Sequence, residues 1–289
     1  GEELEVEELT PESFEGIDIA LFSAGGERSR EFAPAAVDAG AVVIDNSSAF
    51  RMEPSVPLVV PEVNPDDVKW HEGIIANPNC STIQMVVALK PIHDAATIRR
   101  IVVTTMQSVS CTGNTAIQEL FHQSEAILET GEVRVEVYPH RIAFNVIPQI
   151  EGFGGNGYTS EEIKMANETR KIFGDPDIRV TATCVRVPVF NAHSEAVNVQ
   201  TEKALDADAA RQLMLKAPGI VLVDDPEAAE YPLPSLAEGR DEVFVGRIRE
   251  DDSAANCLNL WIVSDNLRKG AATNALQIAE LLVERGLLE

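Results

Sequence analysis

The stretch IDIALFSAGGERSREFAPAAVDAGAVVID, residues 17–45, decides the fold class. Its mostly apolar start at 17–23 predicts a short strand, which runs into Ala24-Gly25-Gly26. A helix is expected over 29–39 and a second strand over 41–45. Strand, turn, helix and strand in this order are typical of a doubly wound parallel sheet, so the sequence predicts an α/β fold.

The rest of the chain predicts a second, larger sheet. LVVPEV at 58–63 continues the strand pattern of the first part, and Asn77-Pro78-Asn79 then interrupts it. Further along, long strand-like segments occur with few helices between them, at 99–110, 177–189, 194–202, 242–250 and 257–264. These segments predict one large mixed or antiparallel sheet, and therefore an α+β domain beside the first one.

Four helices are expected around this second sheet. They cover 81–93, 115–128, 161–173 with Thr159 or Ser160 as the cap, and 269–285. The last helix is amphipathic and is expected to pack back on the first domain. We therefore predict one domain from 1–79 together with 268–289, and a second domain from 80–267.

Composition limits the function. A chain of 289 residues favours two joined domains. The net charge of −24 argues against nucleic acid as a partner, because phosphates would be repelled. The sequence contains no apolar run long enough to span a bilayer and no apolar leader, so we expect a cytoplasmic protein without a membrane contact. Its four cysteines are widely spaced and predict neither a disulfide framework nor a metal site.

Cys80 is the strongest candidate nucleophile. Asn79 is a good helix cap, so Cys80 is expected in the first turn of a helix, where the free N–H groups stabilise a thiolate and could hold an oxyanion. His193 lies at a connection between two strand-like stretches and is a candidate acid–base group. Arg186, on a mostly apolar strand, needs a carboxylate, and a substrate can supply one. A small buried cysteine and a histidine held in a loop are the alternatives.

Two other cations and one motif are less specific. Arg51 and Lys164 stand alone in acidic surroundings, and Glu161 with Lys164 could simply form a surface ion pair. The segment at 152–157 matches GxGxxG, but Pro148 interrupts the stretch before it. We therefore expect a glycine-rich loop at 152–157, and no dinucleotide site there.

Several motifs together resemble one family, aspartate-semialdehyde dehydrogenase of the bacterial type. The matching segments follow in order through nearly the whole chain: SAGG (23–26), DNSSAFR (45–51), VPEVN (60–64), NPNCST (77–82), QSVS (107–110), NVIPQI (145–150), EEIKM (161–165), NETRKI (167–172), RVPV (186–189), HSEAV (193–197) and SDNLRKGAATNA (264–275). NPNCST combined with RVPV and the nearby HS is the specific part of this resemblance.

The resemblance implies a Rossmann-like NADP-binding domain and a catalytic and dimerisation domain, assembled as a homodimer. Its reaction is the NADPH-dependent reduction of aspartyl phosphate to aspartate semialdehyde, with release of phosphate, in lysine, threonine and methionine biosynthesis. The implied roles are nucleophile and acid–base group for Cys80 and His193, substrate contacts for Gln107, Glu161 and Arg186, phosphate contacts for Arg51, Asn79 and Lys164, and cofactor contacts for Ser23, Ala24, Gly25, Gly26, Ser110, Cys111 and Asn266. No metal is implied.

Two departures from the family pattern stand out. Cys111 occupies a position where the family usually has glycine. The family's opening strand, with a turn of GATGxVG type, does not occur ahead of residue 17, so we expect an incomplete cofactor sheet. Two other functions therefore stay open: a catalytically silent homologue, and a related acyl-phosphate reductase such as N-acetylglutamyl-phosphate reductase.

Overall fold

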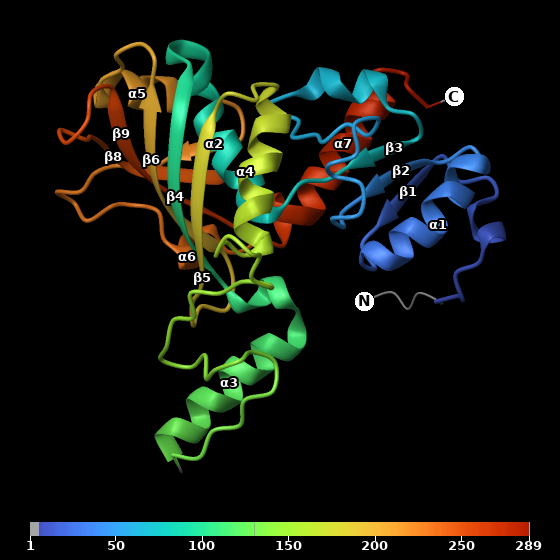
Figure 1. The fold of residues 1–289 in the computed structure, drawn as a ribbon, viewed down its shortest axis with the longest axis horizontal. Helices are drawn as coiled ribbons and strands as arrows, with labels where there is room; N and C mark the ends of the chain where they lie inside the picture. The colour runs from blue at the N-terminus through green and yellow to red at the C-terminus, as the bar shows by residue number, and fades with distance from the viewer. Residues whose placement is uncertain (1–5, 130, 289) are drawn as a thin grey trace.

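The computed structural model describes residues 6–129 and 131–288. A short 3-10 helix, η1 (Pro11–Phe14), leads into a small parallel sheet with the order β1-β2-β3. Strands β1 (Ile19–Phe22) and β2 (Val42–Asp45) are joined by α1 (Gly26–Asp38), as predicted. This sheet and its helix lie to one side of the molecule (Figure 1). The expectation that the cofactor sheet is incomplete stays a prediction.

The third strand is not where the sequence predicted it. β3 is Ile74–Ala76, which follows η2 (Pro65–Trp70), whereas LVVPEV forms only one isolated bridge, from Leu58 to Ala76. Pro57 and Pro61 flank the buried residues of LVVPEV and lack N–H groups, so the segment cannot continue a ladder. Instead, the side chain of Asn64 accepts a hydrogen bond from Val60 N at 2.8 Å.

The second sheet has six strands in the order β5-β4-β6-β9-β8-β7, which confirms the mixed sheet. β4 (Ile98–Gln107) pairs in parallel with β5 (Arg179–Arg186) and antiparallel with β6 (His193–Thr201). β9 (Cys257–Ser264) lies between β6 and β8 (Val243–Glu250). The sequence prediction missed the edge strand β7 (Ile220–Leu222) and the short helices α5 (Ala207–Met214) and α6 (Pro234–Ala237).

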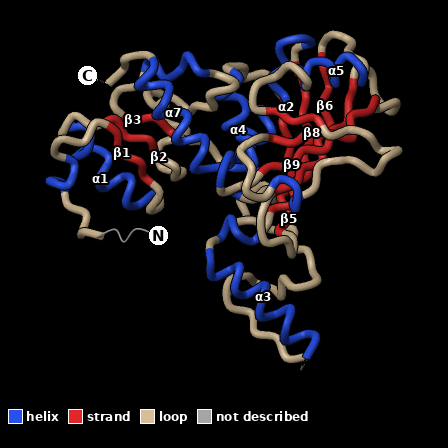
Figure 2. Tube along the Cα trace, turned by 180° about the vertical axis from the view of Figure 1, so that it is seen from behind, coloured by secondary structure: helices blue, strands red, loops and turns tan. Residues whose placement is uncertain are grey.

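The expected helices are present, and two of them pack against the large sheet. α2 (Cys80–Ala96) and α4 (Ser160–Phe173) lie beside it, and α2 is buried along most of its length (Figures 1 and 2). A π-helical turn, η4 (Arg268–Ala272), precedes α7 (Thr273–Glu284), whose Ile278 and Leu282 share a core with Val42 and Ile44 of the small sheet. The exact division into two domains stays a prediction.

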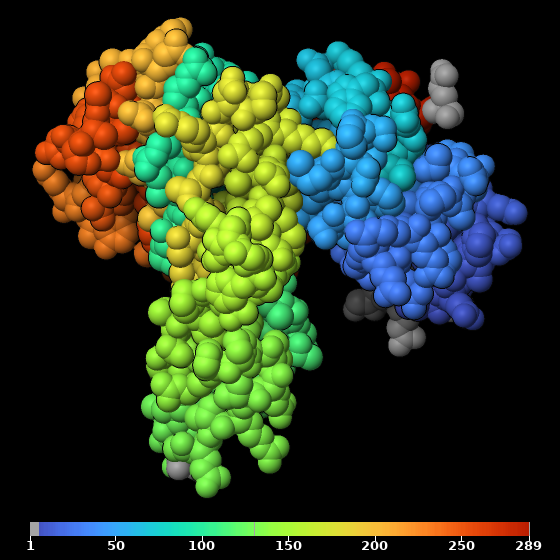
Figure 3. Space-filling view, in the orientation of Figure 1, coloured from blue at the N-terminus to red at the C-terminus, as the bar shows by residue number. Residues whose placement is uncertain are grey.

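One part of the chain projects from the body. β4 ends in the 3-10 helix η3 (Val109–Thr112), which is followed by α3 (Asn114–Glu129) and a return segment at 131–150. Figure 3 shows this arm projecting from the rest of the molecule. Its own small core includes Val109, Leu120 and Ile142. Over the described residues, every helix is too short or too polar to cross a lipid bilayer.

Candidate active site

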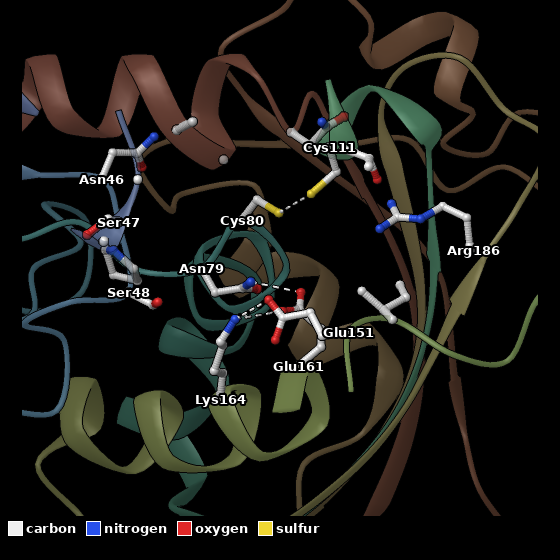
Figure 4. Close-up of a pocket in the computed structure, with 18 of the residues that line it drawn as sticks. Asn46, Ser47, Ser48, Asn79, Cys80, Cys111, Glu151, Glu161, Lys164 and Arg186 are labelled. Carbon is white, nitrogen blue, oxygen red and sulfur yellow. Dashed lines mark hydrogen bonds and ion pairs between the residues drawn. The ribbon is translucent and has the colours of Figure 1, made fainter. Parts of the chain in front are cut away.

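A cavity of about 780 Å³ lies where the small sheet, the large sheet and the arm meet. Turns after β1 and β2, the starts of α2 and α4, η3, η4 and the arm all contribute to its wall (Figure 4). Of the predicted site residues, those on the wall are Gly25, Gly26, Arg51, Asn79, Cys80, Cys111, Glu161, Lys164, Arg186 and Asn266. Ser23, Ala24, Gln107, Ser110 and His193 lie behind it or beside it.

Cys80 is the first residue of α2. Asn79 caps the helix, because its Oδ1 accepts from Ser81 N at 2.9 Å and from Thr82 N at 3.3 Å. The helix N-terminus therefore faces the thiol and favours its thiolate. However, two of the N–H groups expected to hold an oxyanion are occupied by the cap. Sequence reasoning also missed Gly270, where an added Cβ would lie only 2.8 Å from the Cβ of Cys80.

The thiol of Cys80 has a second thiol beside it. Its Sγ lies 3.6 Å from the Sγ of Cys111, which is exposed on η3 (Figure 4). Hydrogen bonding between the two thiols raises the pKa of Cys80, and burial raises it further. The same thiol pair lowers the pKa of Cys111 well below its usual range, and the nearby His193 lowers it further. The pair therefore holds one thiolate more easily than a single cysteine would.

His193 is buried behind these sulfurs. Its Nδ1 accepts a hydrogen bond from the backbone N–H of Ser108 at 3.0 Å, so the neutral ring carries its proton on Nε2. Among the described residues Nε2 has no hydrogen-bond partner, and the ligand atoms of Cys80, Cys111 and His193 lie within 4.8 Å of one another. The ring is thus placed to donate a proton or a hydrogen bond toward the thiols.

Arg186 is a buried cation at the end of β5. One guanidinium nitrogen donates to the carbonyl of Ser108 at 2.6 Å, and the group lies 5.8 Å from the ring centroid of Tyr138. Nε has no partner, and no carboxylate of the described residues forms an ion pair with Arg186. A buried guanidinium without a counter-ion is a site for a ligand carboxylate.

Glu161 is the carboxylate on the opposite side of the cavity. Its Oε1 accepts from Asn79 Nδ2 at 2.8 Å and from Gln107 Nε2 at 3.0 Å. Lys164 Nζ lies 3.7 Å from Oε2, so the two residues do pair, but Glu161 is only 3% exposed, which excludes a surface pair. Burial raises the pKa of Glu161, and the negative charge of Cys111 raises it further.

Arg51 already has partners of its own. Its NH1 lies 3.2 Å from Glu168 Oε1, and its Nε and NH2 donate to backbone carbonyls of Asn77 and Asn46. The other oxygen of Glu168 accepts from Asn79 N at 2.7 Å. Sequence reasoning did not single out Glu168, although it lies in the quoted segment NETRKI. Ser47 and Ser48 complete this wall of the cavity.

The turn after β1 fits a dinucleotide phosphate. Gly25 has φ of 91°, which side chains rarely adopt, and Gly26 begins α1. The N–H groups of the α1 N-terminus thus face the cavity, an arrangement that binds anions. Asn266 is held by Ser108 Oγ at 3.0 Å and by Ala192 N at 3.0 Å, so its side chain also fixes η3 against the start of β6.

The fold and the family models define the class of protein. A model described as "Semialdehyde dehydrogenase, NAD binding domain" matches residues 1–71, and one described as "Semialdehyde dehydrogenase, dimerisation domain" matches 89–269. The chain is thus a semialdehyde dehydrogenase, an oxidoreductase that uses a nicotinamide dinucleotide.

Known relatives show which family of semialdehyde dehydrogenases the chain resembles. The aspartate-semialdehyde dehydrogenase of Aquifex aeolicus is 58% identical over all of this chain and 86% of its own length, and that of Bacillus subtilis is 53% identical over the same shares. A crystal structure of aspartate-semialdehyde dehydrogenase II from Vibrio cholerae matches with a TM-score of 0.90 and 54% identity, over 92% of this chain and 79% of that one. The chain belongs to the aspartate-semialdehyde dehydrogenase family.

Proposed function

We propose that this enzyme reduces L-aspartyl 4-phosphate to L-aspartate 4-semialdehyde with NADPH, and that the reverse reaction consumes inorganic phosphate. One observation carries the proposal: Cys80, at the start of α2, shares its cavity with Arg186, a buried cation that has no carboxylate partner among the described residues. A substrate with a carboxylate at one end and an acyl group at the other spans these two residues. A Vibrio cholerae relative has been solved in complex with ASA.

Cys80 is the nucleophile of the proposed mechanism. Its thiolate attacks the acyl carbon, phosphate leaves, and a thioester to Cys80 remains. When bound, NADPH would supply the hydride needed at the thioester carbon, and Cys80 would then leave as a thiolate while the aldehyde forms. The N-terminus of α2 favours the thiolate at both stages and opposes the hydrogen bond with Cys111 and the burial, which raise the pKa of Cys80.

His193 provides the proton-donating half of the predicted acid–base role. The backbone N–H of Ser108 fixes the ring through Nδ1, so the Nε2 proton faces the sulfurs. From there Nε2–H can stabilise the thiolate and the oxyanion that develops on the acyl oxygen. Since the ring is fully buried, water does not compete for this proton.

The predicted substrate and phosphate contacts bind the different groups of the substrate. Arg186 holds the α-carboxylate, Glu161 the α-ammonium, and Gln107 the acyl group near the thiol. We propose that Lys164, Arg51 and Asn79 bind the departing phosphate. Phosphate then competes with Glu151 for Lys164 and with Glu168 for Arg51. Both ion pairs therefore weaken when phosphate binds.

The cofactor enters along the β1–α1 turn. Gly25 and Gly26 lie on the cavity wall at the N-terminus of α1, and Ser110 and Asn266 lie across from them on η3 and the loop before η4. We propose NADP over NAD; a Candida albicans relative of 26% identity and TM-score 0.71 has been solved with NADP.

The test is a steady-state assay of phosphate-dependent NADP reduction with L-aspartate 4-semialdehyde. We expect turnover that needs phosphate, is lost in Cys80→Ser, and is far slower with N-acetylglutamate semialdehyde. A preference for N-acetylglutamate semialdehyde would identify the related acyl-phosphate reductase. Failure to bind NADPH in a titration of the same protein would support the silent homologue.

A further inference from the structure

Cys111 is a second thiol to which the proposed reaction gives no chemical step. It is exposed, and its Sγ lies 3.6 Å from the Sγ of Cys80. We propose that Cys80 and Cys111 are a site of reversible oxidative modification, forming a disulfide when the protein meets a hydroperoxide. That the disulfide also stops turnover rests on the proposed role of Cys80.

The geometry places the two sulfurs close to bonding distance. A disulfide bond is about 2.05 Å long, so the sulfurs must approach by about 1.5 Å. Cys80 is fixed at the start of the buried helix α2, whereas Cys111 lies in the four-residue turn η3, which ends at Gly113 with φ of 106°. Rotation of the exposed Cys111 side chain is therefore the natural way to close the gap.

The surroundings make one of the two thiols reactive. The Cys80 thiol donates toward the sulfur of Cys111, and His193 lies close beside it; both lower the pKa of Cys111. A stabilised and exposed thiolate is the form that peroxides attack. The other two cysteines differ: Cys184 and Cys257 are buried, and burial raises the pKa of each.

The proposed chemistry balances in two steps. The Cys111 thiolate attacks a hydroperoxide, an S–O bond forms as the O–O bond breaks, and the departing alkoxide takes a proton to become an alcohol. The Cys80 thiolate then attacks the Cys111 sulfur, an S–S bond forms as the S–O bond breaks, and the departing hydroxide takes a proton to become water. Two thiols and one hydroperoxide thus give a disulfide, an alcohol and water. A dithiol reductant reverses the bond by exchange.

A soft metal ion is the competing occupant of this cluster, because two sulfurs and His193 are close enough to ligate one. The tautomer of His193 argues against it. Metal-bound histidines need a lone pair on the ligating nitrogen and donate a proton from the other nitrogen. Here Nδ1 accepts the backbone N–H of Ser108, which leaves the proton on Nε2, the nitrogen that faces the sulfurs.

The experiment treats the reduced 289-residue chain with a few equivalents of hydrogen peroxide in the presence of EDTA. Remaining thiols are blocked with N-ethylmaleimide, and peptides are analysed by mass spectrometry with and without dithiothreitol. Cys111→Ser is the test variant, and Cys257→Ser, with a buried cysteine away from the cavity, is the control. Activity is normalised to the starting value of each protein.

We expect a peptide cross-linked between residues 80 and 111 in the wild type and in Cys257→Ser, with most activity regained after dithiothreitol. In Cys111→Ser, Cys80 should advance to sulfinic acid, so that less than about a fifth of the lost activity returns. Absence of the cross-linked peptide, or equal sulfinic acid at Cys80 with and without Cys111, overturns the proposal. The mass readout needs no turnover, so it stands even if the proposed function fails.

Discussion

Arg186 and Arg51 are both buried cations of the same cavity, but they differ in what surrounds them. Arg51 has the carboxylate of Glu168 at 3.2 Å, whereas the partners of the Arg186 guanidinium among the described residues are a backbone carbonyl and the ring of Tyr138. An unpaired buried guanidinium costs free energy until a ligand pairs with it, which supports our proposal that Arg186 binds an anionic ligand. Arg51 can hold Asn77 and Glu168 in place even without one.

This contrast predicts that lysine substitutions at the two positions affect different ligands. Arg186→Lys should lower kcat/KM for aspartate semialdehyde about 10- to 100-fold, because a point charge cannot replace a bidentate fork. Arg51→Lys should chiefly raise KM for inorganic phosphate. Steady-state kinetics with each substrate varied in turn is the measurement. If both variants are impaired for one and the same substrate, the division of roles is wrong.

Gly270 supports a second prediction at this scale. An added Cβ at Gly270 would lie 2.8 Å from the Cβ of Cys80, so Gly270→Ala must displace the thiol. We expect a roughly 10- to 100-fold loss of kcat with little change in Tm, because a small misplacement of a nucleophile is costly. Gly155→Ala is the matched control, since nothing lies within 4 Å of its added Cβ. Equal activity of the two variants would contradict this prediction.

At the scale of elements, α2 connects the stability of the fold with the reactivity of the site. Its cap, Asn79, accepts from two backbone N–H groups and also donates to Glu161. α4 has a cap of its own, Thr159, in a reciprocal arrangement with Glu162. Both caps stabilise a helix, but only the cap of α2 adjoins the thiol of Cys80.

We therefore expect Asn79→Ala and Thr159→Ala each to lower the free energy of unfolding by about 1 kcal/mol. Only Asn79→Ala should slow the alkylation of Cys80 by iodoacetamide at neutral pH, because its first turn no longer holds the sulfur at the helix N-terminus. Both variants are best compared in a Cys111→Ser background, so that Cys80 is the only thiol of the cavity that can be labelled. Equal labelling rates in the two variants would show that the Asn79 cap does not control the reactivity of Cys80.

The same elements explain what the sequence could predict. The periodic strands and the helix caps depend on neighbours in the chain, so β1, β2, the long strands and α4 with its Thr159 cap were predicted correctly. The strand prediction for LVVPEV was wrong, because a buried segment between two prolines shows the same apolar sequence pattern as a buried strand. The partner of Arg51 and the close approach of Gly270 to Cys80 depend on tertiary packing, which no local pattern records.

At the scale of the whole molecule, the two faces of the large sheet differ. Alternate residues such as Ile101 and Val103 of β4 and Val197 of β6 are buried on the side of α2 and α4. Their neighbours on the opposite face, including Val102, Thr104 and Ala196, remain partly or fully exposed. These strands lie within the residues matched by the dimerisation-domain model. We propose that the open face joins two copies of the chain, which the match to a dimerisation-domain model supports.

The open sheet face therefore predicts where a single charge will separate a dimer. Ala196 lies in the middle of β6, so Ala196→Arg places a long cation where the second sheet must approach, and it should shift the protein toward the monomer in sedimentation velocity. Ala254→Arg, in the exposed turn between β8 and β9, is the matched control and should leave the mass unchanged. Because Ala196 is exposed in the single chain, the variant should keep a Tm typical of a folded protein. A dimer that persists in Ala196→Arg at micromolar concentration would move the interface to another surface, with the arm around α3 as the next place to examine.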